Sequence, residues 1–544
     1  MKKHVCLFCA AVVVAVYATE PVTDCYWHWM NGNVSTNGIT ADLEYLKAGG
    51  VDAAMIFDVG IGVKRGPVDY NSREWRDSVK WACKEAERLG MELSLHNSPG
   101  YTAMGGPWIT PEESMKELTW RVVGSDELGA ESLPPHKHGY YREIAAIPLS
   151  TADETIEINK RLDAGESITI PLDGEKDVVA INLWRGEREK PLDRFDGPRD
   201  YAPRVTIAGM GAIAMPVLRA HDVPGRLVLK KPVKVKEIKL TVSRGANIAR
   251  MEVISSKPAN GRVLRIGYTT TGQCVTAAPE SGIGLECDKF SRKGVDAHFA
   301  KFLGPLLDEL KPWCGTTLRY IVMDSWEAGK QDWTEDFPVE FKARRGYDMT
   351  PYLACLTGRE VQGRQWTLRF LMDYEQTKQE LFIDNFIKPF KEHLAKYNLK
   401  YAGEPYGDGD FTTETLAPLI DLPMSEYWAR SHYGTVERVK RVNNASPNAS
   451  VHGCEFATAY PGDADIEPTL VNFKDDIDVL VACGVNRFTF HCVAHQPSDT
   501  SRLTMGPFGT RFDRAHCTVA QLREMTDYIK GAIENAKSSK EITK

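Results

Sequence analysis

The sequence predicts an α/β protein built on a TIM-like (β/α)8 barrel, with an antiparallel β-sandwich domain inserted into it. Three observations lead to this prediction. Strand-like and helical segments alternate towards both ends of the chain, as they do in folds with a parallel sheet. Between residues 126 and 276 helical periodicity is replaced by short runs of alternating polar and apolar residues. Each strand-like segment assigned to the barrel ends in polar side chains that a hydrophobic core would exclude.

The N-terminus has the pattern of a secretory signal peptide. Lys2 and Lys3 precede VCLFCAAVVVAVYA, an apolar stretch that is too short to span a bilayer comfortably. Val16 and Ala18 place small residues before a cleavage point near residue 19. We therefore predict a signal peptide over residues 1–18 and a secreted, periplasmic protein that is free of the membrane after cleavage. A short membrane anchor is the alternative.

The length, net charge and cysteine spacing of the chain limit its number of domains and the kinds of partner it can bind. The 544 residues exceed one ordinary domain, and the net charge is −7 without a basic run, which argues against a nucleic-acid partner. Of the 12 cysteines, two lie in the predicted signal peptide, and the other ten are scattered without Cys-x-x-Cys or zinc-type spacing. The sequence does not indicate disulfides or an oligomeric state.

The first part of the barrel is predicted over residues 19–125. CYWHWMNG reads as a strand, and ITADLEYLKAGG as an amphipathic helix closed by glycines. VDAAMIFDVG is the second strand, SREWRDSVKWACKEAERLG the second helix, and MELSLHNSPG the third strand. A helix closed by glycine and followed by an apolar strand is typical of βαβ units, which form parallel sheets.

The inserted domain is predicted over residues 126–276. Its strand-like runs include ESITIPLDG, DVVAINLWRG and GRLVLKKPVKVKEIKLTVS, separated by turn sequences such as Asp196-Gly197-Pro198. This pattern favours an antiparallel sandwich of the jelly-roll type. An extension of the main sheet is the alternative.

The remainder of the barrel is predicted over residues 277–535, followed by a polar tail over residues 536–544. The candidate strands are TLRYIVMDSWE, LKYAGEP, DLPMSEYW, VHGCEFAT and NRFTFHCVAH, as strands four to eight. GIGLECDKF would make a ninth strand, and we interpret it as a bridge from the inserted domain instead.

The strand ends carry the candidate site. In a (β/α)8 barrel the C-terminal ends of the strands meet at one mouth, where the active sites of this fold lie. The polar residues at these ends are His28, Asn31, Asp58, His96, Asn97, Asp324, Glu327, Glu404, Glu426, Glu455, His491 and His495. Any one of them is explained by a salt bridge or a helix cap, but the whole set is hard to explain in that way. Several carboxylates in one cup, with tryptophans nearby, suit glycoside hydrolysis, which needs one protonated carboxyl and one carboxylate.

The longest motifs resemble glycoside hydrolase family 106, the bacterial α-L-rhamnosidases. The resemblance runs from about Cys25 to Arg514 and rests on WHWMNGNVSTNGITADLEYLKAGGVDAAMIFDVG, GGPWITPEESM, MDSWEAGKQDWTEDFPVEFKARRGYD, HGCEFATAYPGD and GVNRFTFHCVAHQPSDTSRLTMGPFGTRFDR. It implies inverting hydrolysis of terminal α-L-rhamnosides with calcium in the site, and it favours Glu327 and Glu455 as the catalytic carboxylates. Members of the family carry further β-domains after the barrel, whereas this sequence ends soon after it.

These observations together predict an exo-acting α-L-rhamnosidase that acts on plant or other complex polysaccharides. Glu327, beside Trp326 in an apolar run, is predicted as the general acid, and Glu455 as the base. The other polar residues of the set are predicted to bind substrate: His28, Asn31, Asp58, His96, Asn97, Asp324, Glu404, His491 and His495. An inactive carbohydrate-binding protein and a retaining glycosidase for another sugar are the alternatives.

Glu426 is predicted to be a calcium ligand. Its strand lies between those of the catalytic pair, and a third free carboxylate there would raise the pKa values of its neighbours. Calcium prefers several oxygen ligands and would remove this conflict. An ion pair with Arg430, His432 or another nearby cation is the alternative.

Overall fold

The computed structural model describes residues 23–101, 103–149, 153–185, 203–207, 211–214, 225–243, 245–256, 262–429, 435–460, 466–506 and 508–542. The predicted signal peptide lies outside these ranges, as do Arg430 and His432. None of the helices within them is long and apolar enough to cross a membrane.

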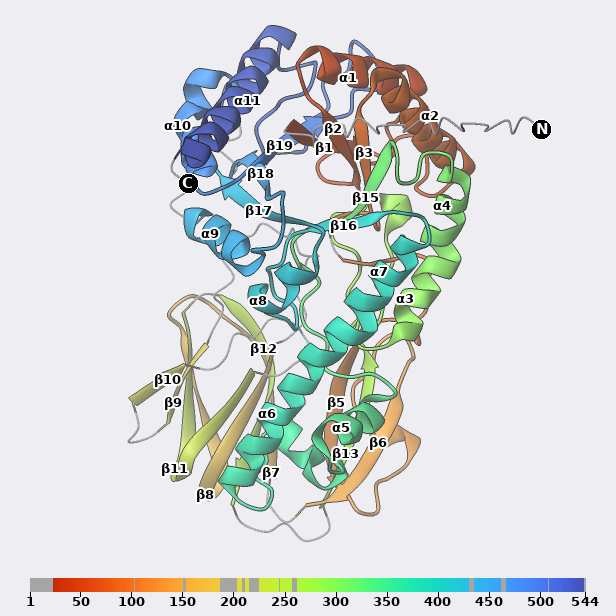
Figure 1. Cartoon of the computed structure of the whole chain (residues 1–544). Helices are drawn as coiled ribbons and strands as arrows, with labels where there is room; N and C mark the ends of the chain where they lie inside the picture. Colours follow the sequence, from red (N-terminus) through yellow and green to blue (C-terminus); the bar gives the residue numbers. More distant parts are fainter. Residues whose placement is uncertain are drawn as a thin grey trace, which may run out of the picture.

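Eight parallel strands close into a barrel, so the predicted fold class is confirmed (Figure 1). Around the barrel they are β1 (Thr23–Met30), β2 (Ala53–Val59), β3 (Glu92–His96), β15 (Leu318–Met323), β16 (Lys400–Gly403), β17 (Leu422–Trp428), β18 (Gly453–Thr458) and β19 (Arg487–Ala494), which pairs again with β1. These are the eight segments that the sequence predicts. The helices between and after them include α1 (Thr36–Ala48), α2 (Arg73–Leu89), α9 (Thr435–Ala445), α10 (Leu470–Ala482) and α11 (Val519–Ile542).

Side-chain caps fix the starts of the first two helices, and a glycine ends the second. The Ser35 hydroxyl accepts a hydrogen bond from the Gly38 amide at the start of α1, and the Ser72 hydroxyl accepts one from the Trp75 amide at the start of α2. Such caps satisfy backbone donors that have no partner within the helix. Gly90 ends α2 in a left-handed conformation, φ 62°, which glycine adopts without steric cost.

Side chains alternate between the barrel interior and the surrounding helices. On β2, Met55 and Phe57 join an interior cluster, whereas Ala54 and Ile56 join the larger core under the helices. The N-terminal floor of the interior is ionic: Arg487 contacts Asp24, and its Nη2 lies 2.7 Å from Glu92 Oε1, all of them buried. The apolar layer above this floor separates it from the mouth.

Between β3 and β15 the chain forms antiparallel sheets, which lie below the barrel in Figure 1. One sheet has the order β5 (Lys116–Gly124), β13 (Arg262–Thr270), β6 (Arg142–Pro148). The other has the order β10 (Gly211–Ala214), β9 (Pro203–Ile207), β11 (Gly225–Val242), β8 (Ser167–Arg185), β12 (Ala246–Ser255), β7 (Asp153–Leu162), and has a hydrophobic core of its own. The first strand of these two sheets, β5, begins at Lys116, before the boundary expected at residue 126.

The segment GIGLECDKF lies outside the barrel, as predicted. It contributes β14 (Leu285–Glu286), which pairs only with β4 (Gly105–Gly106) in a two-stranded sheet among the described strands.

The long segment that connects β15 to β16 contacts the inserted sheets and so links them to the barrel. Helix α6 (Arg364–Leu381) runs past these sheets in Figure 1. Just before it, Arg359 donates to Glu252 of β12 at 2.9 Å, and Asn182 of β8 donates to the Thr357 carbonyl at 2.9 Å. All four residues are buried, and such paired polar groups hold two surfaces in one orientation.

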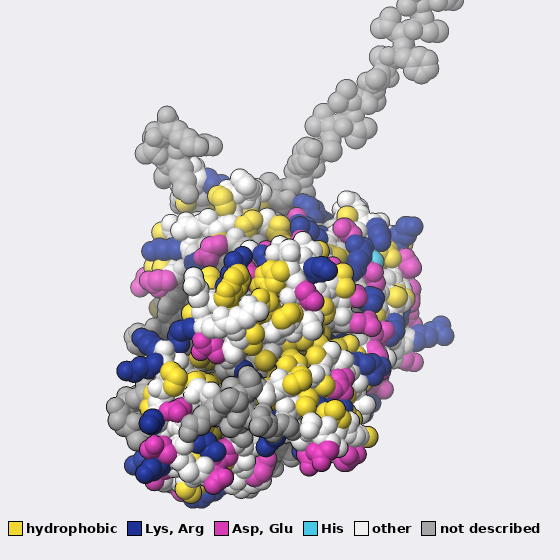
Figure 2. Space-filling model, turned by 90° about the horizontal axis from the view of Figure 1, so that it is seen from below, with side chains coloured by type: hydrophobic (Ala, Val, Ile, Leu, Met, Phe, Trp, Pro, Cys, Tyr) yellow, Lys and Arg dark blue, Asp and Glu magenta, His cyan; other side chains and the backbone are white. Residues whose placement is uncertain are grey.

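The face seen from below in Figure 2 carries both signs of charge. Lys and Arg side chains are interspersed with Asp and Glu around its rim, and hydrophobic side chains gather nearer its centre. Among the side chains that the structure describes, this face has no continuous basic surface of the kind that binds nucleic acids.

Candidate active site

The polar cup predicted at the barrel mouth is formed by inward-facing positions at the upper ends of the strands. On β17 the interior positions are, in order towards the mouth, the apolar Leu422 and Met424 and then Glu426. Glu455 of β18 is the register partner of Glu426, so both project from the same face of the sheet. The barrel interior thus changes from apolar to acidic as it approaches the mouth.

Three carboxylates converge there. Asp324 follows β15, Glu404 follows β16, and Glu455 lies on β18; one oxygen from each lies within 4.8 Å of the others. Glu404 and Glu455 are buried, and Asp324 is half-buried. Desolvation first, and then the charge of Asp324, raise the pKa of Glu455 to about 8 and also raise the pKa of Glu404. Glu404 and Glu455 can both be ionised at neutral pH only if a positive charge is close.

Arg438 supplies part of that charge, although no motif in the sequence singles it out. It contacts the Glu426 carboxylate from α9, and its guanidinium lies over the Tyr406 ring, 4.8 Å from the centroid. Its charge opposes the rise in the pKa of both Glu404 and Glu455. Glu426 therefore pairs with a cation, Arg438, which is the alternative to its predicted role as a calcium ligand. The carboxylate oxygens that converge at the mouth belong to Asp324, Glu404 and Glu455 instead.

Glu455 is held by its own strand. The Thr458 hydroxyl donates to Glu455 Oε1, and His491 Nδ1 lies 3.7 Å from the same oxygen. Burial lowers the pKa of His491 to about 3, so this imidazole is neutral and does not neutralise Glu455. Thr458 orients the carboxylate, and the sequence gives no sign of this role, because threonine is common in strands.

Glu327 lies in the loop three residues after Asp324 and is half-buried. The adjacent Trp326 packs instead against Phe382, Phe386 and Phe411, and is buried. The sequence-based reason for an elevated Glu327 pKa, burial beside that indole, is therefore weakened. The Trp326 amide donates to the Tyr406 carbonyl at 2.8 Å, which ties the loops after β15 and β16 together.

Several buried polar atoms at this end lack protein partners in the part of the chain that the structure describes. They are both ring nitrogens of His28, Nε2 of His96 and the side-chain amide of Asn97. Burial lowers the pKa of His28 well below its usual range and that of His96 to about 4, so both rings are neutral. Leaving a buried polar atom without a partner costs about 1–3 kcal/mol, so these groups are suited to the hydroxyls of a bound ligand.

Asp58 and Asn31 point elsewhere. Phe57 and Val59 face the barrel interior, so Asp58 between them faces α2, where it accepts a hydrogen bond from the Trp75 indole at 2.9 Å. The Asn31 side chain donates to the Val63 carbonyl at 2.8 Å and accepts from the Glu280 amide at 3.0 Å. The structure thus gives no support to their assignment as substrate-binding residues.

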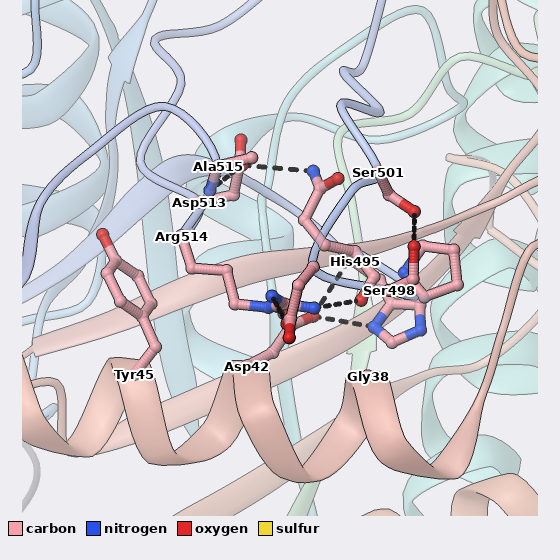
Figure 3. A network of polar contacts seen from close by, with 12 residues as sticks. Gly38, Asp42, Tyr45, His495, Ser498, Ser501, Asp513, Arg514 and Ala515 are labelled. Atoms are coloured by element: carbon pink, nitrogen blue, oxygen red, sulfur yellow. Dashed lines mark hydrogen bonds and ion pairs between the residues drawn. The ribbon is translucent and has the colours of Figure 1, made fainter.

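His495 likewise belongs to a structural network between α1 and the segment that follows β19 (Figure 3). Its Nδ1 lies 2.7 Å from Asp42 Oδ2, and its Nε2 accepts from the Ser35 amide at 3.3 Å. Arg514 donates to the other Asp42 oxygen at 2.7 Å. With both ring nitrogens occupied and the side chain fully buried, His495 joins the last strand to the first helix and has no nitrogen left for a sugar.

The position of Asp58 predicts a pH effect on stability. Burial raises its pKa to about 8, against about 4 in an unfolded chain, so the folded state binds this proton more tightly. Its contribution to the free energy of unfolding is therefore largest below about pH 4 and is lost as the pH rises to about 8. Asp58→Asn keeps an acceptor for Trp75 and should flatten stability across this window, measured by urea denaturation. Asp77→Asn, on the solvent side of α2, is the control; equal pH slopes for Asp58→Asn and wild type would contradict the assignment.

Comparison with known proteins assigns this chain to a family. The family model described as alpha-L-rhamnosidase, of glycoside hydrolase family 106, matches residues 18–183 and 254–533. A protein of Formosa agariphila named "Putative beta-glucuronidase" is 30% identical over 513 residues, which cover 93% of this chain and 40% of that protein. The solved structure of a rhamnosidase from Novosphingobium sp. PP1Y superposes with a TM-score of 0.72 at 21% identity, over 94% of this chain and 59% of that one.

This chain spans less than two thirds of the length of either relative. The structural likeness supports the shared fold, and the family match covers both parts of the barrel, including the segments that carry Glu327, Glu404 and Glu455. The chain belongs to glycoside hydrolase family 106, the α-L-rhamnosidase family.

Proposed function

We propose that this protein is a secreted, exo-acting, inverting α-L-rhamnosidase that removes terminal α-L-rhamnose from plant or other complex polysaccharides. The observation that carries the proposal is the convergence of Asp324, Glu404 and Glu455 at the mouth of a family 106 barrel, with Glu327 in the same loop as Asp324. Neutral His28, His96 and Asn97 supply hydrogen-bonding groups for the hydroxyls of a single sugar.

In the proposed reaction Glu327 is the general acid and Glu455 the general base. Glu327 gives its proton to the glycosidic oxygen as the bond to the anomeric carbon breaks. Glu455 takes a proton from a water molecule that attacks the opposite face of that carbon, so the product has inverted configuration. Thr458 holds one Glu455 oxygen, and in the proposed reaction the other accepts the proton of the water. Both carboxyls then return to their starting states by exchanging protons with solvent.

The same three carboxylates fit a calcium ion. Two oxygens that each lie 2.3–2.6 Å from one ion are at most about 5.2 Å apart, and the oxygens of Asp324, Glu404 and Glu455 satisfy this limit. Carboxylate oxygens are also the donors that calcium prefers. When bound, calcium would add positive charge beside Glu455, which keeps a base ionised, and would take oxygen ligands from the sugar. Asp324 and Glu404 would be its principal protein ligands, in place of Glu426.

Removal of calcium is therefore expected to abolish hydrolysis reversibly. Chelation followed by dialysis should yield inactive protein, and isothermal titration should show one calcium site in that protein. Asp324→Asn combined with Glu404→Gln should lose the site. Glu426→Gln should keep it, because Glu426 contacts Arg438. If Glu426→Gln loses calcium binding and the double variant does not, Glu426 is the calcium ligand. Full activity after exhaustive chelation would show that hydrolysis does not need calcium.

The test of the proposed function compares substrates with the same leaving group. The protein should release nitrophenol from an aryl α-L-rhamnoside and not from the matching aryl β-D-glucuronide, which is included because of the name of the Formosa relative. Release from the glucuronide alone would overturn the choice of sugar. Binding of rhamnose without turnover of any glycoside would instead identify a carbohydrate-binding protein.

A further inference from the structure

An exposed pair of aromatic rings stands at the rim of the barrel mouth. Trp428 is the last residue of β17, and Tyr460 follows β18 by two residues. Their ring centroids are 4.3 Å apart with planes inclined by 34°. Trp428 is half-buried, and Tyr460 is 43% exposed, so the pair presents aromatic surface to solvent.

The direction of Trp428 follows from the alternation along β17. Tyr427 faces the outer helices, where its hydroxyl donates to Asp476 of α10 at 2.8 Å. Trp428 packs against the interior cluster that contains Leu422 and Met424. Its indole therefore lies on the inner side of the barrel, beyond Met424 and towards the mouth. It is not packed between the strands and the outer helices.

The pair is also tied to the proposed base. Trp428 is the register partner of Thr458, whose hydroxyl donates to Glu455, and the Ala429 amide donates to the Thr458 carbonyl at 2.7 Å. The aromatic pair and Glu455 are thus carried by the same two adjacent strands. The histidines suited to sugar hydroxyls, His28 and His96, come from β1 and β3 on other sides of the barrel.

We propose that Trp428 and Tyr460 form a stacking site for the sugar ring on the leaving-group side of the scissile bond. This inference rests on the proposed function. A terminal rhamnose that fills the buried part of the cup must leave the rest of its chain at the rim, towards solvent. Aromatic rings pack against the apolar face of a sugar ring there, while its hydroxyls remain hydrated. The pair therefore selects substrates in which rhamnose is attached to a second pyranose.

The experiment compares two substrates that share the rhamnose. One is α-L-rhamnosyl fluoride, which has no leaving-group sugar, and the other is a rhamnose-terminated disaccharide. In Trp428→Ala and Tyr460→Ala the fall in kcat/KM on the disaccharide should exceed the fall on the fluoride by about 3- to 10-fold, mainly through KM. The control is Trp366→Ala on α6, a tryptophan that is 46% exposed, close to the 43% of Tyr460; it should change the rate on neither substrate.

Equal effects on the two substrates, or none on either, would overturn the stacking site while leaving the proposed function intact. If wild-type protein cleaves neither substrate, the proposed function fails, and tryptophan fluorescence then decides on the stacking site. Quenching by the disaccharide in wild type that is lost in Trp428→Ala supports it, and no quenching in wild type overturns it. A dimer in sedimentation velocity that Trp428→Ala dissociates would instead assign the rings to contact between copies of the chain.

Discussion

Replacing Glu327 with glutamine is expected to slow hydrolysis of rhamnosides with poor leaving groups by about 10²–10⁴-fold, the usual contribution of a general acid. Glutamine has no proton to give to the departing oxygen. Aryl rhamnosides with acidic leaving groups need little protonation, so they should lose much less activity. The measurement is kcat/KM across a series of rhamnosides whose leaving groups differ in pKa.

Glu455→Gln is the informative comparison, because a missing base should slow all these substrates to a similar extent. Glu414→Gln, on an exposed carboxylate paired with Arg441, is the control and should behave as wild type. Burial and then the charge of Asp324 raise the pKa of Glu455 to about 8, which would suit an acid if no cation were bound. If Glu455→Gln shows the dependence on leaving group and Glu327→Gln does not, the two roles are reversed.

Replacing Arg487 with methionine is expected to lower the free energy of unfolding by about 3–5 kcal/mol, as the loss of one partner from a buried ion pair does. Arg487 is fully buried at the floor of the barrel and contacts both Asp24 and Glu92. Even with this partner present, burial raises the pKa of Asp24 to about 6. Without it, the two buried carboxyls of Asp24 and Glu92 lose their shared cationic partner.

The control for this experiment is Arg441→Met. Arg441 also pairs with a carboxylate, Glu414, but both side chains are 57% exposed, and such pairs contribute about 0–1 kcal/mol. Chemical denaturation of both variants should separate them clearly. Adding Asp24→Asn and Glu92→Gln to Arg487→Met should recover part of the loss. A loss in Arg487→Met no larger than in Arg441→Met would contradict the role of the ionic floor.

The order of the barrel strands could be predicted from the sequence because helix-closing glycines and apolar strands recur in a fixed order. Convergence of acidic residues followed from the fold, since parallel strands end at one mouth. The direction of a side chain was harder to predict. Asp58 is one position out of phase with the interior residues Phe57 and Val59, and a strand buried on both faces gives no polar alternation that would show this.

Contacts between distant segments could not be predicted. Arg438 is one of several basic residues in an amphipathic helix, and only the fold brings it to Glu426 and over Tyr406. His495 follows its strand as an active-site histidine would, yet Asp42 and Ser35, more than 450 positions earlier, occupy both of its nitrogens. Both cases depend on which helix packs beside which strand, which residue types alone do not determine.

The configuration of the sugar when it is first released tests the central claim most directly. Proton NMR during rapid hydrolysis of an aryl α-L-rhamnoside distinguishes the two anomers of free rhamnose before they interconvert. The proposed pairing of Glu327 and Glu455 as acid and base predicts that β-L-rhamnose appears first and that the α-anomer follows by mutarotation. If α-L-rhamnose appears first, a covalent intermediate has formed and the proposed mechanism is contradicted.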